Sequence, residues 1–311
     1  MAKVLVTGGA GFIGSALVHR FVDLGDEVRV VDNFSTGFRR NLEDVLDRVD
    51  LLEGDLAEMS TAEAAVRGVE LVLHEAAIPS VQRSVEDPVA SNRANITATL
   101  NLLVAARAAR VRRFVYASSS SAYGDSEVLP KVETMPENPI SPYALTKLTG
   151  EKYCVVFHRI YGLPTVCLRY FNVFGPRQNP HSPYSAVISR FINLALDGQS
   201  LTVDGDGEQS RDFTYIDNVV DANLLACHAE GVQGMFFNIG TGERHTLNEL
   251  IALLGKMLGH ELHPAHRAPR TGDVRHSLAD IGKARQLLDY EPRVNFEEGL
   301  RRTLAWFQEN R

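Results

Sequence analysis

The segment VLVTGGAGFIGSALV (residues 4–18) runs from an apolar strand through a glycine-rich turn into an apolar helix. Its glycines fit two related spacings, GxGxxG at Gly9, Gly11 and Gly14 and a three-residue spacing that begins at Gly8. Such glycines make the turn tight and let backbone N–H groups approach a pyrophosphate at the N-terminus of the helix. Because the motif follows a strand and opens a helix, it predicts a dinucleotide-binding βαβ unit.

The next expected strand ends in an acid that bears on the choice of dinucleotide. Asp32 stands eighteen residues after Gly14, where a carboxylate accepts hydrogen bonds from the adenine ribose and repels a 2′-phosphate. NAD is therefore favoured over NADP, and Arg39 and Arg40 leave only slight room for NADP. No metal is expected, because the ten histidines form no tight ligand pattern.

Two later strand ends extend the expected cofactor site. Asp55 follows the third strand, at a position from which an acid could reach the adenine edge. Ala76 and Ala77 follow the fourth strand, and side chains this small let a cofactor lie close to the backbone. Taken alone, these features are equally consistent with a turn and with tight packing.

Short apolar strands alternate with segments of helical period through the first half of the chain. This alternation predicts an α/β fold, a Rossmann-like doubly wound parallel sheet with helices on both faces. The strands are rich in Val and Leu without polar alternation, as strands buried on both faces are. The expected strands are Lys3–Thr7, Glu27–Asp32, Asp50–Glu53, Glu70–His74, Arg113–Ala117 and Thr165–Arg169, and the expected helices are Ile13–Leu24, Thr61–Arg67, Val89–Ala109 and Pro142–Tyr161.

The character of the sequence changes after about residue 175, where a Pro-, Asn- and Ser-rich loop begins. We expect residues 1–175 to form an NAD-binding domain to which residues 213–240 return. Residues 176–212 and 241–311 are expected to form a smaller C-terminal α/β lobe that binds the substrate, with a hairpin around residues 204–207.

Composition excludes several classes of protein. A net charge of −7 gives no reason to expect nucleic acid as a partner. No apolar run approaches the ~20 residues of a membrane span, and the chain runs from Met1 directly into a strand without a signal peptide. Cys154, Cys167 and Cys227 lie far apart with no CxxC pair, which favours a reducing compartment. We therefore expect a soluble cytoplasmic protein.

The segment ISPYALTK (residues 140–147) suggests acid–base chemistry. Ser141 is a suitable N-cap and Pro142 suits the first helical position, so Tyr143 and Lys147 lie on one face of one helix. A free phenol, with a pKa of about 10, is too weak a base at neutral pH. A nearby ammonium favours the phenolate by about 1–3 pH units, and an oxidised nicotinamide adds positive charge. Such a tyrosine can take a proton from a sugar hydroxyl while hydride leaves the same carbon.

With these motifs in place, the chain resembles the extended short-chain dehydrogenase/reductase family, also described as NAD-dependent epimerases and dehydratases. Within it, the chain is most similar to the branch of UDP-hexose 4-epimerases. The resemblance covers almost the whole chain. It is carried by TGGAGFIG, VDNFSTG, GDL, SSSSAYG, YALTK, RYFNVFGPRQ, SRDFTYIDNVVDA and PRTGDVRHS.

The resemblance gives a meaning to the four serines of RRFVYASSSSAYGD (residues 112–125). It implies that Ser119 hydrogen-bonds the substrate's 4-hydroxyl beside Tyr143. Ser120 and Ser121 match positions at which related 4,6-dehydratases carry Asp and Glu, and related decarboxylases keep the Glu. Without these acids, the serines favour simple oxidation and reduction at C4. For Ser118 we expect only capping and packing.

The resemblance also implies two sets of binding residues and a bound NAD. The residues implied for NAD are Gly8, Gly11, Phe12, Ile13, Gly14, Asp32, Asn33, Ser35, Thr36, Gly37, Asp55, Leu56, Ala76, Ala77, Asn95, Tyr143, Lys147 and Phe171. Those implied for a UDP-sugar are Ser80, Ser119, Ser120, Tyr143, Asn172, Val187, Arg211, Arg270, Asp273 and Ser277. Arg211 and Arg270 would meet the diphosphate, because a planar guanidinium suits paired phosphate oxygens.

One of these positions bears on the choice of sugar. Ser277 matches a site near C2 of the sugar where relatives restricted to glucose and galactose carry tyrosine, so serine leaves space for an N-acetyl group. We expect UDP-glucose and UDP-galactose, with the N-acetylated pair, as substrates. A UDP-glucuronate epimerase would need extra donors for a carboxylate, and no obvious pair is present.

Three further expectations remain. A dehydratase or decarboxylase is opposed by Ser120 and Ser121, and a non-catalytic NAD-binding protein is opposed by the complete set of Ser119, Tyr143 and Lys147. The resemblance also implies a homodimer in which the expected helices Val89–Ala109 and Pro142–Tyr161 of each subunit pair as a four-helix bundle.

Overall fold

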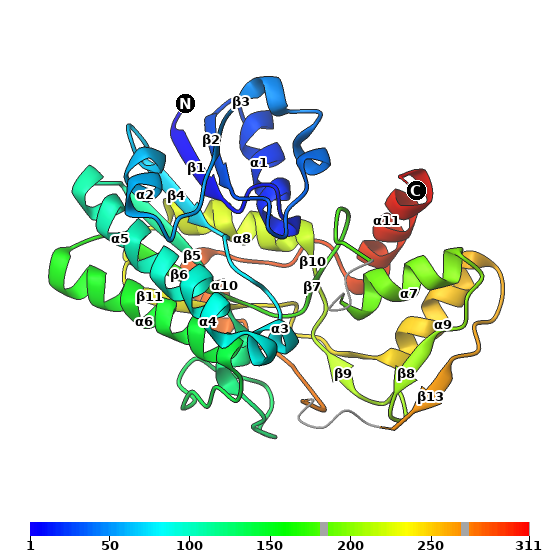
Figure 1. Ribbon diagram of the computed structural model, residues 1–311. Helices are drawn as coiled ribbons and strands as arrows, with labels where there is room; N and C mark the ends of the chain where they lie inside the picture. Colours follow the sequence, from blue (N-terminus) through cyan, green and yellow to red (C-terminus); the bar gives the residue numbers. More distant parts are fainter. Residues whose placement is uncertain (181–185, 269–273, 311) are drawn as a thin grey trace.

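The computed structural model describes residues 1–180, 186–268 and 274–310, and a seven-stranded parallel sheet is its centre (Figure 1). The strand order is β11-β6-β5-β4-β1-β2-β3, so the direction of winding reverses between β1 and β4. In doubly wound sheets, ligands bind outside the carboxyl ends of the strands at such a reversal. The strands are β1 (Lys3–Thr7), β2 (Glu27–Asp32), β3 (Val49–Glu53), β4 (Leu71–His74), β5 (Arg113–Ser119), β6 (Thr165–Tyr170) and β11 (Met235–Ile239).

Helices cover both faces of this sheet, as the unbroken apolar strands predict. On one face α1 (Phe12–Asp23) packs against α8 (Ile216–His228), and on the other α2 (Met59–Ala65) and α6 (Pro142–Tyr161) flank α5 (Ala98–Ala109). Val4 and Val6 of β1 belong to one apolar core and Leu5 between them to the other. The sheet therefore separates two cores, and the Rossmann-like fold is confirmed.

The expected helix over residues 89–109 is interrupted. Its first part is α4 (Pro88–Asn92), which follows α3 (Val81–Glu86), and a π-helical turn (Arg93–Thr97) then precedes α5. Asn95 lies in this turn, where its side-chain oxygen accepts from the backbone N–H of Ile78 (2.8 Å) and its amide donates to Thr146 (2.9 Å). The wider turn presents Asn95 to these neighbours, which sequence periodicity does not reveal.

A second lobe stands beside the carboxyl ends of the strands, on the right of Figure 1. It contains α7 (Val187–Leu196), α9 (Leu247–Leu258), α11 (Phe296–Glu309) and two short strand pairs. The expected hairpin around residues 204–207 is wrong. Here β8 (Thr202–Asp204) pairs with β13 (Ala265–Arg267), whereas β9 (Ser210–Arg211) pairs with β12 (His245–Thr246).

The chain passes between the two parts more than once. After β7 (Val173–Phe174) pairs with β10 (Thr214–Tyr215), α8 and β11 follow, and β11 joins the edge of the sheet beside β6. Later, α10 (Gly282–Leu288) packs against α8 and β11. The remaining short helices are the 3₁₀ turns Arg39–Leu42, Leu46–Arg48 and Ser120–Tyr123. Within the described ranges, no helix combines the length and apolar character needed to cross a bilayer.

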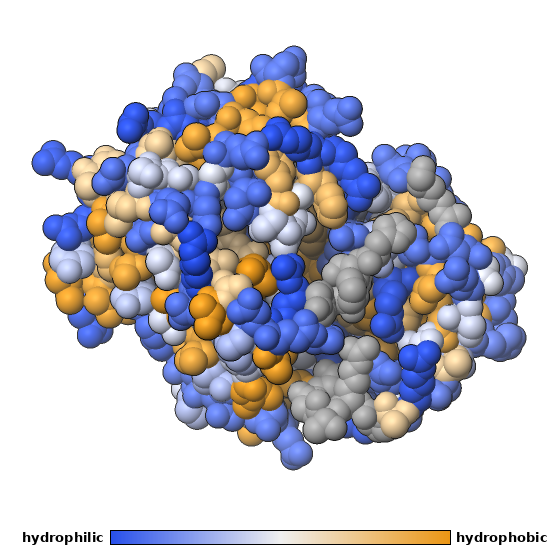
Figure 2. All heavy atoms as spheres, viewed as in Figure 1, coloured by the Kyte–Doolittle hydropathy of each residue, from blue (hydrophilic) through white to orange (hydrophobic). Residues whose placement is uncertain are grey.

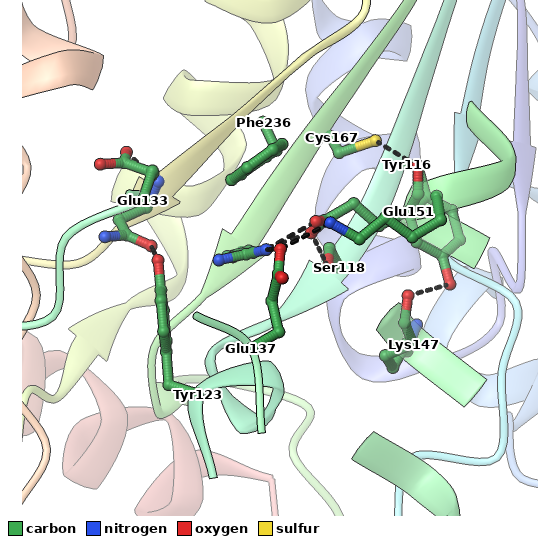
Figure 3. A network of polar contacts seen from close by, with 12 residues as sticks. Tyr116, Ser118, Tyr123, Glu133, Glu137, Lys147, Glu151, Cys167 and Phe236 are labelled. Atoms are coloured by element: carbon green, nitrogen blue, oxygen red, sulfur yellow. Dashed lines mark hydrogen bonds and ion pairs between the residues drawn. The ribbon is translucent and has the colours of Figure 1, made fainter. Parts of the chain in front are cut away.

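The long helix α6 is anchored to the sheet by a buried ion pair (Figure 3). Glu151, one turn after Lys147, accepts from Nε (2.8 Å) and Nη2 (2.7 Å) of Arg169 on β6, and both side chains are fully buried. The hydroxyl of Ser118, at the end of β5, donates to the same carboxylate (2.7 Å). One carboxylate therefore joins α6, β5 and β6.

A wider polar network surrounds this pair. Nη2 of Arg169 also donates to Glu137 (3.1 Å), which in turn accepts from Lys152 (2.6 Å). The guanidinium lies over the rings of Tyr123 (4.7 Å) and Phe236 (4.2 Å). Burial lowers the pKa of Arg169, but the hydrogen bonds to Glu151 and its charge outweigh this effect. The net pKa is raised, so the guanidinium stays charged.

We predict that Glu151→Gln strongly destabilises the protein, because it leaves the Arg169 cation buried without its carboxylate. The expected loss is about 3–5 kcal/mol of unfolding free energy, measured by urea denaturation. Lys152→Gln, the next position on the same helix, is the control, because its partly exposed ion pair is worth about 1 kcal/mol or less. Equal losses in the two variants would contradict the assigned importance of the buried pair.

Candidate active site

A cleft of about 860 Å³ lies at the carboxyl ends of the strands, between the sheet and the second lobe. Its wall includes the turn after β1, the ends of β2 to β6 and the N-terminus of α6. Residues of the second lobe, including Arg211 and Ser277, complete the lining. The volume is within the range of small-molecule and cofactor sites, about 300–1,000 Å³.

The glycine turn forms one end of the cleft, with a backbone that side chains would block. Gly8 has φ +64°, and a Cβ on Gly14 would lie 2.1 Å from the carbonyl oxygen of Gly8. The N-terminus of α1 carries no side-chain cap, so its N–H groups are available to a ligand. Phe12 and Ile13 line the cleft at this point. Closely approaching backbone at a helix N-terminus fits the pyrophosphate of NAD.

Asp32 is held against this turn. Its two carboxylate oxygens accept from the backbone N–H groups of Ala10 (2.9 Å) and Phe34 (2.7 Å). Burial raises the pKa of Asp32, and these hydrogen bonds lower it. The side chain lines the cleft. It therefore stabilises the loop as well as standing at the position expected for ribose contact, and the sequence motif indicates only the second role.

Most of the remaining residues expected to bind NAD line the same cleft. Asp55 accepts from the backbone N–H of Ala57 (2.8 Å) and from the guanidinium of Arg93. Asn95 is the exception, because it is buried beneath the surface with its amide engaged as described above. The others on the cleft wall are Gly11, Asn33, Ser35, Thr36, Gly37, Leu56, Ala76, Ala77 and Phe171.

Ser119, Tyr143 and Lys147 all line the cleft. The helical spacing predicts that Tyr143 and Lys147 share a face, and the resemblance places Ser119 beside them. The helix that carries the last two begins where expected, because Ser141 accepts from the N–H of Ala144 (3.1 Å) and Pro142 follows it. Lys147 is buried, and its ammonium donates to the carbonyl oxygen of Ala117 (2.8 Å). Burial lowers the pKa of Lys147 to about 8.

The predicted lowering of the Tyr143 pKa is not found in the chain alone. Burial raises the pKa of Tyr143, and a hydrogen bond with Ser119 lowers it by less. The ammonium of Lys147 is turned toward Ala117, whose carbonyl oxygen it binds. The sequence gives the spacing of the two residues but not the desolvation of the phenol, which depends on packing.

The four serines have different partners. Ser118 does more than cap a strand, because its hydroxyl donates to the buried Glu151. Ser121 donates its hydroxyl to Oγ of Ser119 (2.9 Å), which leaves the Ser119 proton free for another acceptor. Ser120 lines the cleft. Two of the four hydroxyls therefore organise the end of β5, and Ser119 is poised to donate.

The residues that the resemblance implies for a UDP-sugar are spread over both parts of the fold. Ser80, Asn172, Arg211 and Ser277 line the cleft. Val187, the first residue of α7, lines a smaller adjoining pocket of about 260 Å³ that shares Asn172 and Arg211 with the cleft. Arg270 and Asp273 lie outside the described residues.

Several polar residues of the cleft are absent from the expected set. Glu75, which directly follows β4, accepts a hydrogen bond from Tyr170 (2.9 Å), and burial raises its pKa to about 7. An acid immediately after a buried strand is the signal that could have identified it. The cationic or titratable residues Arg83, Lys131, Arg177 and His276 also line the cleft. In the described residues, no group of three or more His, Cys, Asp or Glu is placed to hold a metal ion.

Comparison with known proteins defines the class to which this fold and cleft belong. The model of the NAD dependent epimerase/dehydratase family matches residues 4–240, and the chain belongs to this family. A UDP-glucose 4-epimerase of Mycolicibacterium smegmatis is 37% identical over 310 residues, which covers 98% of each chain. A UDP-glucuronate 4-epimerase of Thermodesulfobacterium geofontis is 32% identical and covers 100% of this chain and 97% of its own.

Solved structures of such epimerases are similar to this chain over almost its whole length. A UDP-glucose 4-epimerase of Thermotoga maritima with UDP-glucose is 40% identical, with a TM-score of 0.94 and 99% of each chain covered. A UDP-N-acetylglucosamine 4-epimerase of Methanobrevibacter ruminantium, in complex with UDP-N-acetylmuramic acid, has a TM-score of 0.95 at 38% identity, with 100% and 99% covered. A Thermus thermophilus UDP-glucose 4-epimerase with NAD has a TM-score of 0.89 at 38% identity, with 99% and 100% covered. NAD is the cofactor of this family, and the glycine turn and Asp32 fit it.

Proposed function

We propose that the chain is a UDP-hexose 4-epimerase that interconverts UDP-glucose with UDP-galactose and UDP-GlcNAc with UDP-GalNAc. The observation that carries the proposal is the convergence of Ser119, Tyr143 and Lys147 on a cleft that also contains the NAD-binding glycine turn. The similarity to UDP-glucose and UDP-N-acetylglucosamine 4-epimerases supports it.

The catalytic residues have separate tasks in this reaction. Bound NAD would supply the hydride acceptor and donor for C4 of the sugar, and a positive charge when oxidised. Tyr143 takes the proton of the 4-hydroxyl, while Ser119 donates a hydrogen bond to the same oxygen. Lys147 stabilises the phenolate. The resulting 4-ketone is reduced on its opposite face, and Tyr143 returns the proton, so atoms and charge balance over one cycle.

The two parts of the fold divide the binding between them. Residues 1–175 with 213–240 hold NAD and contribute Ser119, Tyr143 and Asn172 to the sugar site. Residues 176–212 with 241–311 complete the binding of the UDP-sugar. Asn172 and Arg211 line both pockets, which supports their assignment to the diphosphate, with Arg270 as a second cation. A cytoplasmic location is supported by the three free cysteine thiols.

Ser120 and Ser121 oppose elimination of water across C5–C6, because neither hydroxyl can act as the acid and base that this reaction needs. UDP-glucuronate is the second candidate substrate. Lys131, only 3% exposed, lines the cleft, and an ammonium there could meet a C6 carboxylate.

A substrate panel tests the function directly. Purified protein without added cofactor is incubated separately with UDP-glucose, UDP-GlcNAc and UDP-glucuronate, and C4 epimers are followed by proton NMR. We expect turnover of the first two. Tyr143→Phe should retain NAD but lose turnover by about 10²–10⁴-fold, because it removes the base. A 4-keto-6-deoxy product, or turnover of UDP-glucuronate alone, would contradict the proposal.

Ser277 provides a test of the sugar pocket. We predict that Ser277→Tyr lowers kcat/KM for UDP-GlcNAc by about 10- to 100-fold while UDP-glucose turnover changes little, because the larger side chain occupies space beside C2. Ser277→Ala is the matched control and should retain both activities. Parallel losses for both sugars would show that Ser277 does not select the C2 substituent.

We further propose that the protein is a homodimer. Large aliphatic side chains are exposed on α3, α4 and α6, and Figure 2 shows apolar side chains gathered over these helices. Contiguous exposed apolar surface is characteristic of interaction sites. The most exposed of these residues are Val81, Val85, Val89, Leu145 and Ile160.

Analytical ultracentrifugation should give a mass of twice 34.3 kDa for the wild type. Val89→Asp, at a side chain that is 76% exposed, should shift the protein toward monomer, because it places a charge in the apolar surface. Val128→Asp, at an exposed position outside this surface, is the control and should remain dimeric. A monomeric wild type would contradict the assembly.

A further inference from the structure

The cleft contains a carboxyl group that the proposed reaction does not use. Glu75 directly follows β4, is half-buried and lines the cleft. Its Oε1 accepts from the hydroxyl of Tyr170 (2.9 Å), and that hydroxyl accepts from the side-chain amide of Asn223 on α8 (2.8 Å). The same hydroxyl lies 3.2 Å from Oδ1 of Asn223, so the Asn223 side chain holds Tyr170 beside the carboxylate. The position of the Glu75 carboxylate in the cleft is therefore fixed by the fold.

Strand register places Glu75 near Lys147. His74 pairs with Tyr116, so Glu75 is level with Ala117 on the neighbouring strand. Ala117 is the residue whose carbonyl oxygen binds the ammonium of Lys147 at 2.8 Å. Neighbouring strands lie about 4.8 Å apart. The ammonium therefore lies over the strand next to Glu75, at the same level of the sheet.

The groups that surround Glu75 come from β6, α6 and its own strand, β4. Burial raises the pKa of Glu75, and the Tyr170 hydrogen bond and the Lys147 ammonium lower it. Burial lowers the pKa of Lys147, and the Glu75 charge raises it. The charge of the Glu75 carboxylate also raises the pKa of Tyr143, which lies on α6 with Lys147. Beneath the strand end, His74 is buried, and burial keeps it neutral by lowering its pKa to about 3.

We propose that Glu75 is a positioning residue of this active site, whose carboxylate, fixed by Tyr170, is the counter-charge that keeps the buried Lys147 protonated. The inference about charge stands on the chain itself, and its consequence for turnover rests on the proposed epimerase function. A protonated Lys147 is what stabilises the Tyr143 phenolate, so Glu75 acts through Lys147 and does not contact the reacting carbon.

The sign of the effect follows from the two directions. Burial favours neutral Lys147, so the ammonium is lost as the pH rises through its lowered pKa. The Glu75 carboxylate opposes that loss. Without it, Lys147 releases its proton at a lower pH, and turnover that needs the ammonium is lost at a lower pH as well.

The first measurement is direct and needs no substrate. Lysines are labelled with ¹³C at Cε, and the Lys147 signal is identified by its absence in Lys147→Arg. In Glu75→Gln the midpoint of the Lys147 titration should fall by about 1 pH unit or more. Glu70→Gln, an exposed glutamate at the other end of the same strand, is the matched control and should leave it unchanged. An unchanged midpoint in Glu75→Gln would overturn the proposal.

Two further variants guard against a fold defect. Glu75→Ala removes the charge without an amide that could rebond to Tyr170, and it should lower the midpoint in the same direction. Glu75→Asp keeps the charge, so its Lys147 midpoint should lie between those of Glu75→Gln and the wild type. Cooperative thermal unfolding and bound NAD content show that each variant is folded. If the midpoint of the Lys147 titration were the same as in the wild type in both Glu75→Gln and Glu75→Ala, the proposal would be contradicted, even if one variant were destabilised.

The catalytic consequence is read from the pH profile of kcat with UDP-glucose. In Glu75→Gln the alkaline limb should move to lower pH, with the largest loss of kcat above pH 7 and little change in KM. A uniform loss at every pH would indicate a structural role and overturn the proposal. If the wild type turned over no UDP-sugar, the proposed function would fail, whereas the lysine titration would still decide the charge interaction.

Discussion

The buried ion pair between Glu151 and Arg169 is the constraint on which the geometry of the cleft depends. It joins α6 to β6 in a bidentate contact, and Ser118 adds β5 to the same carboxylate. Lys147 lies one turn before Glu151 on α6, and Ser119 directly follows Ser118. The pair therefore sets the register between the helix that carries Tyr143 and Lys147 and the strand that carries Ser119. A buried pair of this kind contributes less to net stability than to a unique arrangement, and here that arrangement brings Ser119, Tyr143 and Lys147 to one cleft.

The cleft above this pair combines two kinds of binding surface. At one end, backbone approaches closely at the glycine turn, and Asp32 fixes the loop. At the other, side chains from the second lobe supply polar and cationic groups such as Arg211. Between them lie the buried Lys147 and the half-buried Glu75; the Lys147 charge lowers the pKa of Glu75, and the Glu75 charge raises the pKa of Lys147. In the proposed reaction the protein supplies charge and orientation, while bound NAD would supply the redox chemistry.

Local signals in the sequence predict α6 and six of the seven strands of the sheet, but β11 is not among the expected strands. Buried strands are continuous apolar runs, and Ser141, Pro142 and Gly162 mark the ends of α6. The strand pairs of the second lobe could not be predicted, because β8 and β9 pair with residues far along the chain. The position of Asn95 depends on a π-helical turn, and the pKa of Tyr143 on desolvation. Both are products of packing. The surroundings of Glu75 cannot be predicted from the sequence, because Tyr170 and Lys147 approach it only in the folded chain.

The proposed chemistry requires that the hydrogen on C4 leaves and returns as hydride without meeting solvent. This can be measured by giving the purified protein UDP-glucose that carries deuterium at C4, in ordinary water, and analysing the UDP-galactose formed. Retention of deuterium at C4 of the product, with slower turnover than for the unlabelled sugar, is the expected result. Replacement of the deuterium by solvent hydrogen would contradict hydride transfer within a closed cleft, and with it the roles assigned to Ser119, Tyr143 and Lys147.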